Sequence, residues 1–182
     1  MPVDCMVGTS LDIVTADAVT SGIEGFDLFT AYRSALRNAT AASPEAHFGR
    51  ADLPATLFRG YTSAAIEESV SWTLEGAIND AGAAVLAREL ARRSEGAQAA
   101  RYRAEARYLA GRALDYDRLL DTDSLFFRPR EASGAFADEP FDPRIWGGGH
   151  TETNAWGSRV LVHHDGAGLA RLFGGPSALG EA

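Results

Sequence analysis

Hydrophobic residues recur along the first two thirds of the chain with the period of α-helices. The segment 10–22 begins with Ser10, a favoured N-cap residue, and ends at Gly22, a residue on which helices commonly stop. The segment 26–40 follows with apolar positions spaced for one helical face, namely Phe29, Tyr32, Leu36 and Ala39. The pattern therefore predicts two helices near the N-terminus.

The strongest helical pattern lies in the middle of the chain. One apolar stripe runs from about 65 to 93, with Thr62 or Ser63 as the expected N-cap, and a second runs from about 97 to 120. The second stripe is predicted to turn inward with Tyr102, Ala106, Leu109 and Leu114. Because the short sequence SEGA separates them, the two helices are expected to form an antiparallel hairpin.

Two other stretches lack this pattern. Residues 43–63 contain two prolines and two glycines and are predicted to be a long connection, which is uncommon unless it is functional. Residues 121–149 contain three prolines and a glycine run, which predict an extended, aromatic-rich loop. Helical pattern resumes near Asn154, and Asp165 is placed to cap a further helix. Nothing resembles the strand alternation of a parallel sheet, so the predicted fold class is all-α.

Composition narrows the class of protein. A chain of 182 residues with 46% hydrophobic and 23% charged residues is typical of one soluble globular domain with a core. The net charge of −8 argues against a nucleic-acid partner, and no apolar run approaches the ~20 residues that cross a membrane. The N-terminus lacks the basic and apolar regions of a signal peptide, and Cys5 is alone, which excludes an internal disulfide.

Residues 146–157, WGGGHTETNAWG, form the most informative segment. It places Glu152 between a glycine run and a predicted helix start, among tryptophans. A carboxyl buried among aromatic rings acquires a raised pKa that suits a general acid. The alternative is that Glu152 only caps the following helix. Likewise, Trp146 and Trp156 could stack beneath a sugar ring or could belong to the core.

Two other polar groups invite a metal interpretation that the residues do not favour. The adjacent His163 and His164 point to different sides of a helix, so we expect a packed His164 beside a capping Asp165. Four aspartates lie close together but lack the glycine and the final glutamate of a calcium loop, and we interpret them as a solvated helix end: Asp115, Asp117, Asp121 and Asp123. No Ser/His/Asp order, paired-cysteine motif or nucleotide-binding glycine loop occurs.

The chain nevertheless resembles a known family. Its WGGGHTETNAW and HHDGAGLARLFGG are similar to W-G-G-x-Y-T-E-G-N-A-W and P-H-D-x-x-G-L-x-x-L-x-G-G of glycoside hydrolase family 92, the calcium-dependent exo-acting α-mannosidases. Upstream, MVGTSLDIVTADAVTSGIEGFDLFTAY, GYTSAAIEESVSWTLEGAIND and LDTDSLFFRPR also resemble family segments. The resemblance is collinear over almost the whole chain, and several motifs in order are far more specific than one.

The resemblance implies a function and its residues. The family's general acid corresponds to Glu152, and Trp146 and Asn154 correspond to residues near its substrate pocket, with Trp156 and His150 as further candidate contacts. The expected fold is part of an (α/α)6 toroid built of helix hairpins, and the expected substrate is a terminal α-mannoside of a mannose-containing glycan. The family's mechanism is inverting, and its calcium ion helps to bind and distort the sugar. The family is commonly exported in bacteria, although no export signal occurs here.

Departures from the family pattern leave alternatives open. Thr153 replaces a glycine and His150 replaces a tyrosine. The catalytic-base motif G-N-D-D-x-G, the G-N-E-P loop and the W-D-T-x-R segment do not occur. We therefore expect residues 1–182 to be one partial catalytic domain, whose base, calcium ligands and remaining portions lie outside the chain. The alternatives are a non-catalytic helical carbohydrate-binding or interaction remnant and, more weakly, a toroid glycosidase with another sugar preference.

Overall fold

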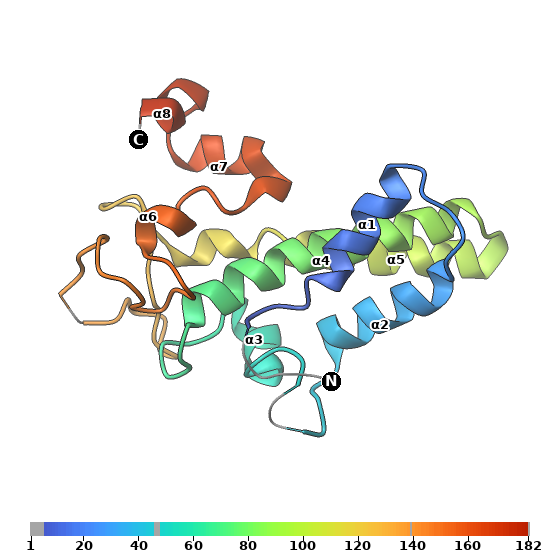
Figure 1. Cartoon of the computed structure of the whole chain (residues 1–182), viewed down its shortest axis with the longest axis horizontal. Coiled ribbons are helices and arrows are strands. Elements are labelled where there is room, and N and C mark those ends of the chain that lie inside the picture. The colour runs from blue at the N-terminus through green and yellow to red at the C-terminus, as the bar shows by residue number, and fades with distance from the viewer. Residues whose placement is uncertain (1–5, 46–47, 139, 182) are drawn as a thin grey trace.

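The structure, a computed structural model, describes residues 6–45, 48–138 and 140–181. Its helices are α1 (Leu11–Thr20), α2 (Leu28–Thr40), α3 (Leu53–Arg59), α4 (Ser69–Arg92), α5 (Gly96–Arg112), α6 (Ala155–Ser158), α7 (Gly166–Leu172) and α8 (Pro176–Glu181) (Figure 1). Two 3-10 helices cover Asp115–Leu119 and His163–Asp165. The strands β1 (Leu120–Asp121) and β2 (Phe126–Phe127) pair antiparallel. The predicted all-α class is confirmed.

The α4–α5 hairpin is the centre of the molecule, and α1 and α2 pack against α4. Small residues permit this close packing: a Cβ atom at Gly82 would lie 2.8 Å from the Cα atom of Ile13 in α1. Between α2 and α5, the Tyr32 and Tyr102 rings meet edge to face at 5.6 Å, and the Tyr32 hydroxyl donates to a Glu105 carboxylate oxygen at 2.6 Å. These contacts belong to a first hydrophobic core, which α1, α2, α4 and α5 share.

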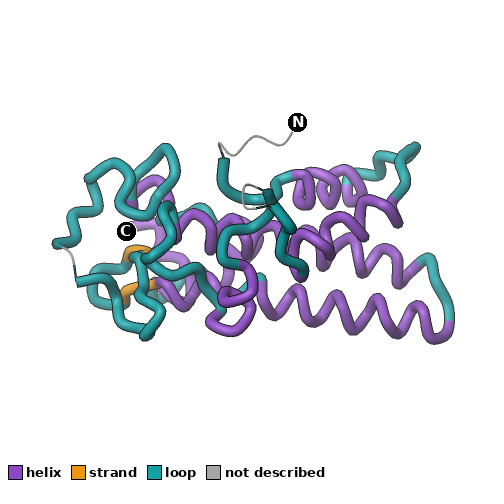
Figure 2. Tube along the Cα trace, turned by 90° about the horizontal axis from the view of Figure 1, so that it is seen from below, coloured by secondary structure: helices purple, strands orange, loops and turns teal. Residues whose placement is uncertain are grey.

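A second core lies at the other end of the hairpin. The first half of α4 packs there against the 3-10 helix Asp115–Leu119, the strand pair and α7. Its largest fully buried members include Tyr116, Phe127, Leu74 and Leu119. Figure 2 shows the loops gathered at this end of the hairpin, beside the two short strands. The first turn of α4 therefore lies next to the aromatic-rich loop.

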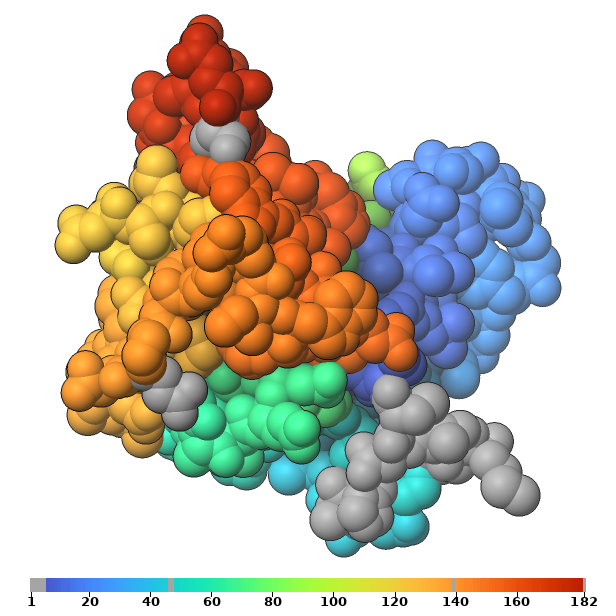
Figure 3. Space-filling view, turned by 60° about the vertical axis from the view of Figure 1, so that its left-hand side comes forward, coloured from blue at the N-terminus to red at the C-terminus, as the bar shows by residue number. Residues whose placement is uncertain are grey.

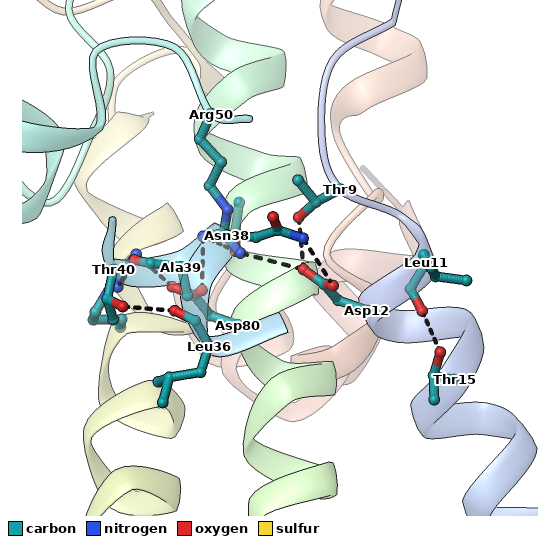
Figure 4. Close-up of polar contacts among 12 residues, drawn as sticks. Thr9, Leu11, Asp12, Thr15, Leu36, Asn38, Ala39, Thr40, Arg50 and Asp80 are labelled. Atoms are coloured by element: carbon teal, nitrogen blue, oxygen red, sulfur yellow. Dashed lines mark hydrogen bonds and ion pairs between the residues drawn. The ribbon is translucent and has the colours of Figure 1, made fainter. Parts of the chain in front are cut away.

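Buried charges connect the 43–63 segment to the helices (Figure 4). Asp80 of α4 accepts from Arg50 at 2.7 Å and forms an ion pair with Arg112 of α5 at 2.9 Å. Arg50 also lies 3.9 Å from Asp12 of α1, which accepts a hydrogen bond from Asn38 of α2 at 3.3 Å. The side chains of Arg50, Asp12 and Asp80 are 6%, 3% and 3% exposed, so the pairs are shielded from water.

The predicted second helix of the hairpin is too long. The structure ends α5 at Arg112 and continues with the 3-10 helix and β1 instead of reaching 120. Leu114, predicted to face inward, is 48% exposed and lies just after the last turn of α5. The Tyr116 hydroxyl instead donates to Asp165 at 2.9 Å, and its ring packs edge to face on Phe127. Contacts with distant segments therefore determine this helix end.

The start of α4 also differs from prediction. Its N-cap is Glu68, not Thr62 or Ser63. Thr62 is buried, and its backbone N–H donates to the Thr73 hydroxyl at 3.0 Å. The predicted 43–63 connection contains the short helix α3. Asp165 caps α7 as predicted, accepting from the Gly168 N–H at 2.9 Å. No helix of the described ranges combines the length and apolar character that a bilayer crossing requires.

Candidate active site

The backbone conformation of the segment before Glu152 requires its run of glycines. Gly147, Gly148 and Gly149 have φ values of 84°, 61° and 96°, a region that residues with side chains rarely adopt. At Gly149 space is limiting as well, because a Cβ atom would lie 2.9 Å from Pro129 Cγ and 3.2 Å from Val70 Cγ2. The run therefore folds residues 146–153 into a tight loop, called here the acid loop, that packs directly on α4.

The acid loop caps the N-terminus of α4. The first N–H groups of a helix lack partners within the helix. The Gly149 carbonyl accepts from two of them, the Val70 N–H at 3.0 Å and the Ser71 N–H at 3.2 Å. In return, the Thr151 N–H donates to the Ser71 hydroxyl at 2.8 Å. A loop 80 residues away in sequence thus completes the end of a long buried helix.

Glu152 lies at the tip of the acid loop. Its φ of 50° is in the left-handed region, and the Gly147 N–H donates to the Thr153 carbonyl at 2.9 Å around it. The side chain is exposed, so the expected burial between aromatic rings is wrong for the described part of the chain. The helix-capping alternative is also wrong, since Asn154 caps α6 by accepting from the Gly157 N–H at 3.2 Å.

Both tryptophans of the segment are at the surface. Trp146 is 70% and Trp156 48% exposed, so neither belongs to the core. The Trp156 ring meets Phe126 edge to face at 4.8 Å, and the Arg159 guanidinium lies 5.0 Å from its centre. The same guanidinium lies over Phe126 and Phe173, and its Nε donates to the Leu125 carbonyl. Trp156 is therefore held at a defined angle while one part of its surface faces solvent.

His150 is the buried member of the loop. It is 3% exposed, and its Nδ1 lies 2.9 Å from the Ser158 hydroxyl, whereas Nε2 is buried without a hydrogen-bond partner. Burial lowers its pKa to about 4, so the ring is neutral at neutral pH. His150 lines a cavity of ≈ 140 Å³ together with Arg128 and Phe141. The ring is thus fixed through Nδ1 by Ser158 and forms part of the cavity wall.

The candidate residues thus fall into two groups. The cavity lining includes His150 but neither Glu152 nor Trp146 or Trp156, which are exposed on the surface. Figure 3 shows the orange segment that contains the loop spread over one face, next to the green start of α4. Asn154 is only partly exposed, and its Nδ2 donates to the Arg144 carbonyl at 3.3 Å. The segment therefore presents one carboxyl and two aromatic rings outward and one imidazole inward.

Sequence reasoning missed polar residues on one face of α4. Ser71, Glu75 and Asn79 follow one another at four-residue spacing. Burial raises the pKa of the Glu75 carboxyl, and both amide atoms of Asn79 are buried without a partner. A Cβ atom at Gly8 would lie 3.2 Å from Glu75 and 3.3 Å from Asn79, so the segment before α1 covers them. Their only sequence signal was a polar stripe within an otherwise apolar helix.

The described residues do not fit a calcium site. In residues 6–45, 48–138 and 140–181, no three Asp, Glu, His or Cys side chains come together in a way that could hold a metal ion. Among the four clustered aspartates, Asp115 pairs with Arg118 at 2.8 Å, and Asp121 pairs with Arg128 at 2.8 Å. Asp121 is 7% exposed, so the solvated-end interpretation is wrong for it. Calcium therefore stays an expectation from the resemblance.

His164 has the packing role predicted for it, whereas His163 is exposed. His164 Nε2 lies 2.7 Å from the Ala113 carbonyl, and its ring meets Tyr116 edge to face at 5.7 Å. Asp165, next to it, caps α7. Burial lowers the pKa of His164, which favours the neutral ring. His164 therefore ties the C-cap of α5 to the 3-10 helix that precedes α7.

The described part of the chain combines a helical fold with a surface segment that carries an exposed carboxyl and two exposed tryptophans. The model of the glycosyl hydrolase family 92 catalytic domain matches residues 1–182. The chain belongs to this family. No curated protein matches the sequence.

Solved structures agree with the family and the fold. The chain is similar to the GH92 inverting mannosidase BT2199 from Bacteroides thetaiotaomicron VPI-5482, with a TM-score of 0.86 and 27% identity over 98% of this chain. It is also similar to the GH92 α-mannosidase BT3965 from the same species in complex with mannoimidazole, with a TM-score of 0.74 and 26% identity over 97% of this chain. Each match covers 23% of the mannosidase. The chain thus has part of the (α/α)6 fold of these mannosidase-like glycosidases.

Proposed function

We propose that residues 1–182 contribute to an α-mannosidase catalytic domain that hydrolyses terminal α-mannosides of glycans with inversion, and that Glu152 is its general acid. The observation that carries the proposal is Glu152 itself, exposed at the tip of a loop that is fixed to α4. An exposed carboxyl on a fixed loop can approach a glycosidic oxygen, whereas a helix cap could not, and the helix cap here is Asn154.

The other groups that the reaction needs are assigned to parts of the domain outside residues 1–182. An inverting glycosidase needs a second carboxylate roughly 6.5–9.5 Å from the acid to activate water. The chain spans 23% of the length of the mannosidases it matches. We assign the base, and the walls that would exclude water from Glu152, to the other portions of such a domain. Calcium, where it is needed, would be held there as well.

Three residues of the segment are suited to the sugar. The outward faces of Trp146 and Trp156 can stack on the C–H faces of a mannose ring, and Asn154 extends the same surface. His150 is assigned a different task, since its ring, fixed by Ser158, forms part of the wall of the cavity beside Phe141. These contacts would orient the glycosidic bond in front of Glu152.

A second candidate function is carbohydrate binding without chemistry. The exposure of both tryptophans together with that of Glu152 favours it, because surface aromatic rings bind sugars with no need for a desolvated acid. It differs from the first proposal in what Glu152 does. A binding module uses the aromatic rings, so the carboxyl group of Glu152 is not needed.

Two measurements on the purified chain test the proposal. Without a base, the chain is expected to release little or no mannose from an α-1,2-mannobioside; robust release would contradict the assignment of the base to other portions. Calorimetric titration with the mannobioside, with and without calcium, is expected to show binding that Glu152→Gln weakens about tenfold, since a hydrogen bond to a charged group is worth about 1–1.5 kcal/mol more than a neutral one. Glu24→Gln, an exposed residue in the α1–α2 connection, is the matched control. Equal affinity for wild type and Glu152→Gln would favour the binding module.

A further inference from the structure

We propose that Ser71 is the residue that positions Glu152, an inference that rests on the role of Glu152 proposed above. Ser71 is in the first turn of α4 and is 4% exposed. Its hydroxyl accepts the hydrogen bond from the Thr151 N–H at 2.8 Å, one residue before Glu152. Among the described residues it is the side-chain hydrogen bond that joins α4 to the acid loop, and its donor is the residue before Glu152.

The hydrogen bond matters because the backbone of Glu152 is not in a relaxed conformation. A residue with a Cβ atom disfavours the left-handed region, and Glu152 has a φ of 50°. The loop is anchored on both sides of it, by the Thr151 N–H on Ser71 and by the Thr153 carbonyl on the Gly147 N–H. If the Ser71 anchor is lost, φ of Glu152 can return to negative values, and its side chain then points in another direction.

The neighbouring hydroxyls on α4 have other tasks. Thr73 donates to the Ser69 carbonyl and accepts from the Thr62 N–H, so it serves the segment before α4. The Ser69 hydroxyl takes part in no hydrogen bond among the described residues, although it is equally buried. Removing the Ser71 hydroxyl leaves the backbone bonds from Val70 and Ser71 to Gly149 in place. The effect of Ser71→Ala is therefore confined to the half of the acid loop that carries Glu152.

The consequence is that the rigid helix α4 fixes the position of Glu152. Helix α4 is 24 residues long and largely buried, whereas most residues of the acid loop are partly or fully exposed. Functional groups are held most accurately when their supports are regular elements with locked side chains. The hydrogen bond to Ser71 fixes Glu152 relative to α4. Because Ser71 itself touches neither the sugar nor the leaving group, we class it as a positioning residue.

Amide hydrogen exchange and backbone chemical shifts, measured by NMR on the chain, test the inference. Ser71→Ala is expected to speed exchange of the Thr151 amide about tenfold and to shift the Glu152 signals away from left-handed values. Ser71→Thr keeps a hydroxyl and should restore both readouts, and Ser69→Ala, the matched control, should change neither. An unchanged Thr151 amide and unchanged Glu152 shifts in Ser71→Ala, or the same changes in Ser69→Ala, would overturn the inference.

A binding experiment separates this inference from the proposed function. Mannobioside affinity is measured for Ser71→Ala, Glu152→Gln and the double variant. If Ser71 acts through Glu152, the double variant binds no more weakly than Glu152→Gln alone. Independent, additive losses would overturn the inference. If instead Glu152→Gln leaves affinity unchanged while Ser71→Ala still alters the Thr151 amide and the Glu152 shifts, the acid role fails and the anchoring by Ser71 stands.

Discussion

Asp80→Ala should destabilise the fold more than an ordinary surface substitution. Asp80 is paired with two arginines, Arg50 at 2.7 Å and Arg112 at 2.9 Å; the side chains of Asp80 and Arg50 are 3% and 6% exposed, and that of Arg112 is 14% exposed. Alanine removes their shared counter-charge and leaves one buried guanidinium group at Arg50 and one partly buried group at Arg112. Arg50 would keep only the carboxylate of Asp12, 3.9 Å away, and the Gly76 carbonyl at 3.3 Å.

The magnitude follows from this geometry. Breaking a buried ion pair by removing one partner costs about 3–5 kcal/mol, because the other charge stays uncompensated. For a chain of this size each kcal/mol lowers the melting temperature by about 2–4 °C, so the expected loss is roughly 6–20 °C. The effect should also reach the 43–63 segment, since Arg50 attaches it to α4.

Circular dichroism melts and urea unfolding at neutral pH provide the assay. Asp17→Ala is the matched control, since Asp17 is exposed on α1 and forms no ion pair among the described residues. The control is expected to change stability by less than about 0.5 kcal/mol. A melting temperature for Asp80→Ala within about 2 °C of the control would refute the reasoning, because it would show that water or another carboxylate already compensates the two arginines.

Two other predictions concern the acid loop. The unfolded chain binds a proton at His150 near pH 6.5, whereas the folded chain does so only near pH 4, so His150 stabilises the fold above pH 6.5 and this contribution is lost as the pH falls toward 4. His150→Gln should flatten the stability–pH curve between these values by up to about 3 kcal/mol, and identical curves in urea titrations would contradict the buried neutral ring. Gly149→Ala should destabilise by about 2–3 kcal/mol, since it combines a φ of 96° with a Cβ atom 2.9 Å from Pro129, whereas Gly148→Ala has no atom within 4 Å and should cost less. Equal melting temperatures for these two variants would show that packing on α4 does not limit the loop.

Much of the fold could be predicted from local pattern. The helical spacing of apolar residues predicts the α4–α5 hairpin. It does not predict where α5 ends, because that end depends on the contacts of Tyr116. That side chain bonds Asp165, 49 residues away, and packs on Phe127 in β2. Single-sequence periodicity contains no information about such partners.

The candidate site was predictable in part for the same reason. Motif resemblance singled out Glu152, whose role as the acid stays a prediction, and the glycine run predicted a loop, which the described structure contains at residues 146–153. The capping alternative failed because Asn154, two residues later, satisfies the helix. Neither the burial of His150 nor the support from Ser71 is visible in the sequence, since one depends on the packing around the cavity and the other on a contact across 80 residues.

The most direct test of the account is a segment exchange. Residues 1–182 replace the corresponding segment of the mannosidase BT2199, which supplies the rest of the domain, and hydrolysis is measured for an α-mannobioside and for an aryl α-mannoside with a good leaving group. If Glu152 is the acid, Glu152→Gln lowers hydrolysis of the mannobioside by at least about 10²-fold and affects the aryl mannoside far less, because a good leaving group departs without a proton. Unimpaired cleavage of the mannobioside by Glu152→Gln, or an equal loss on both substrates, would contradict the account.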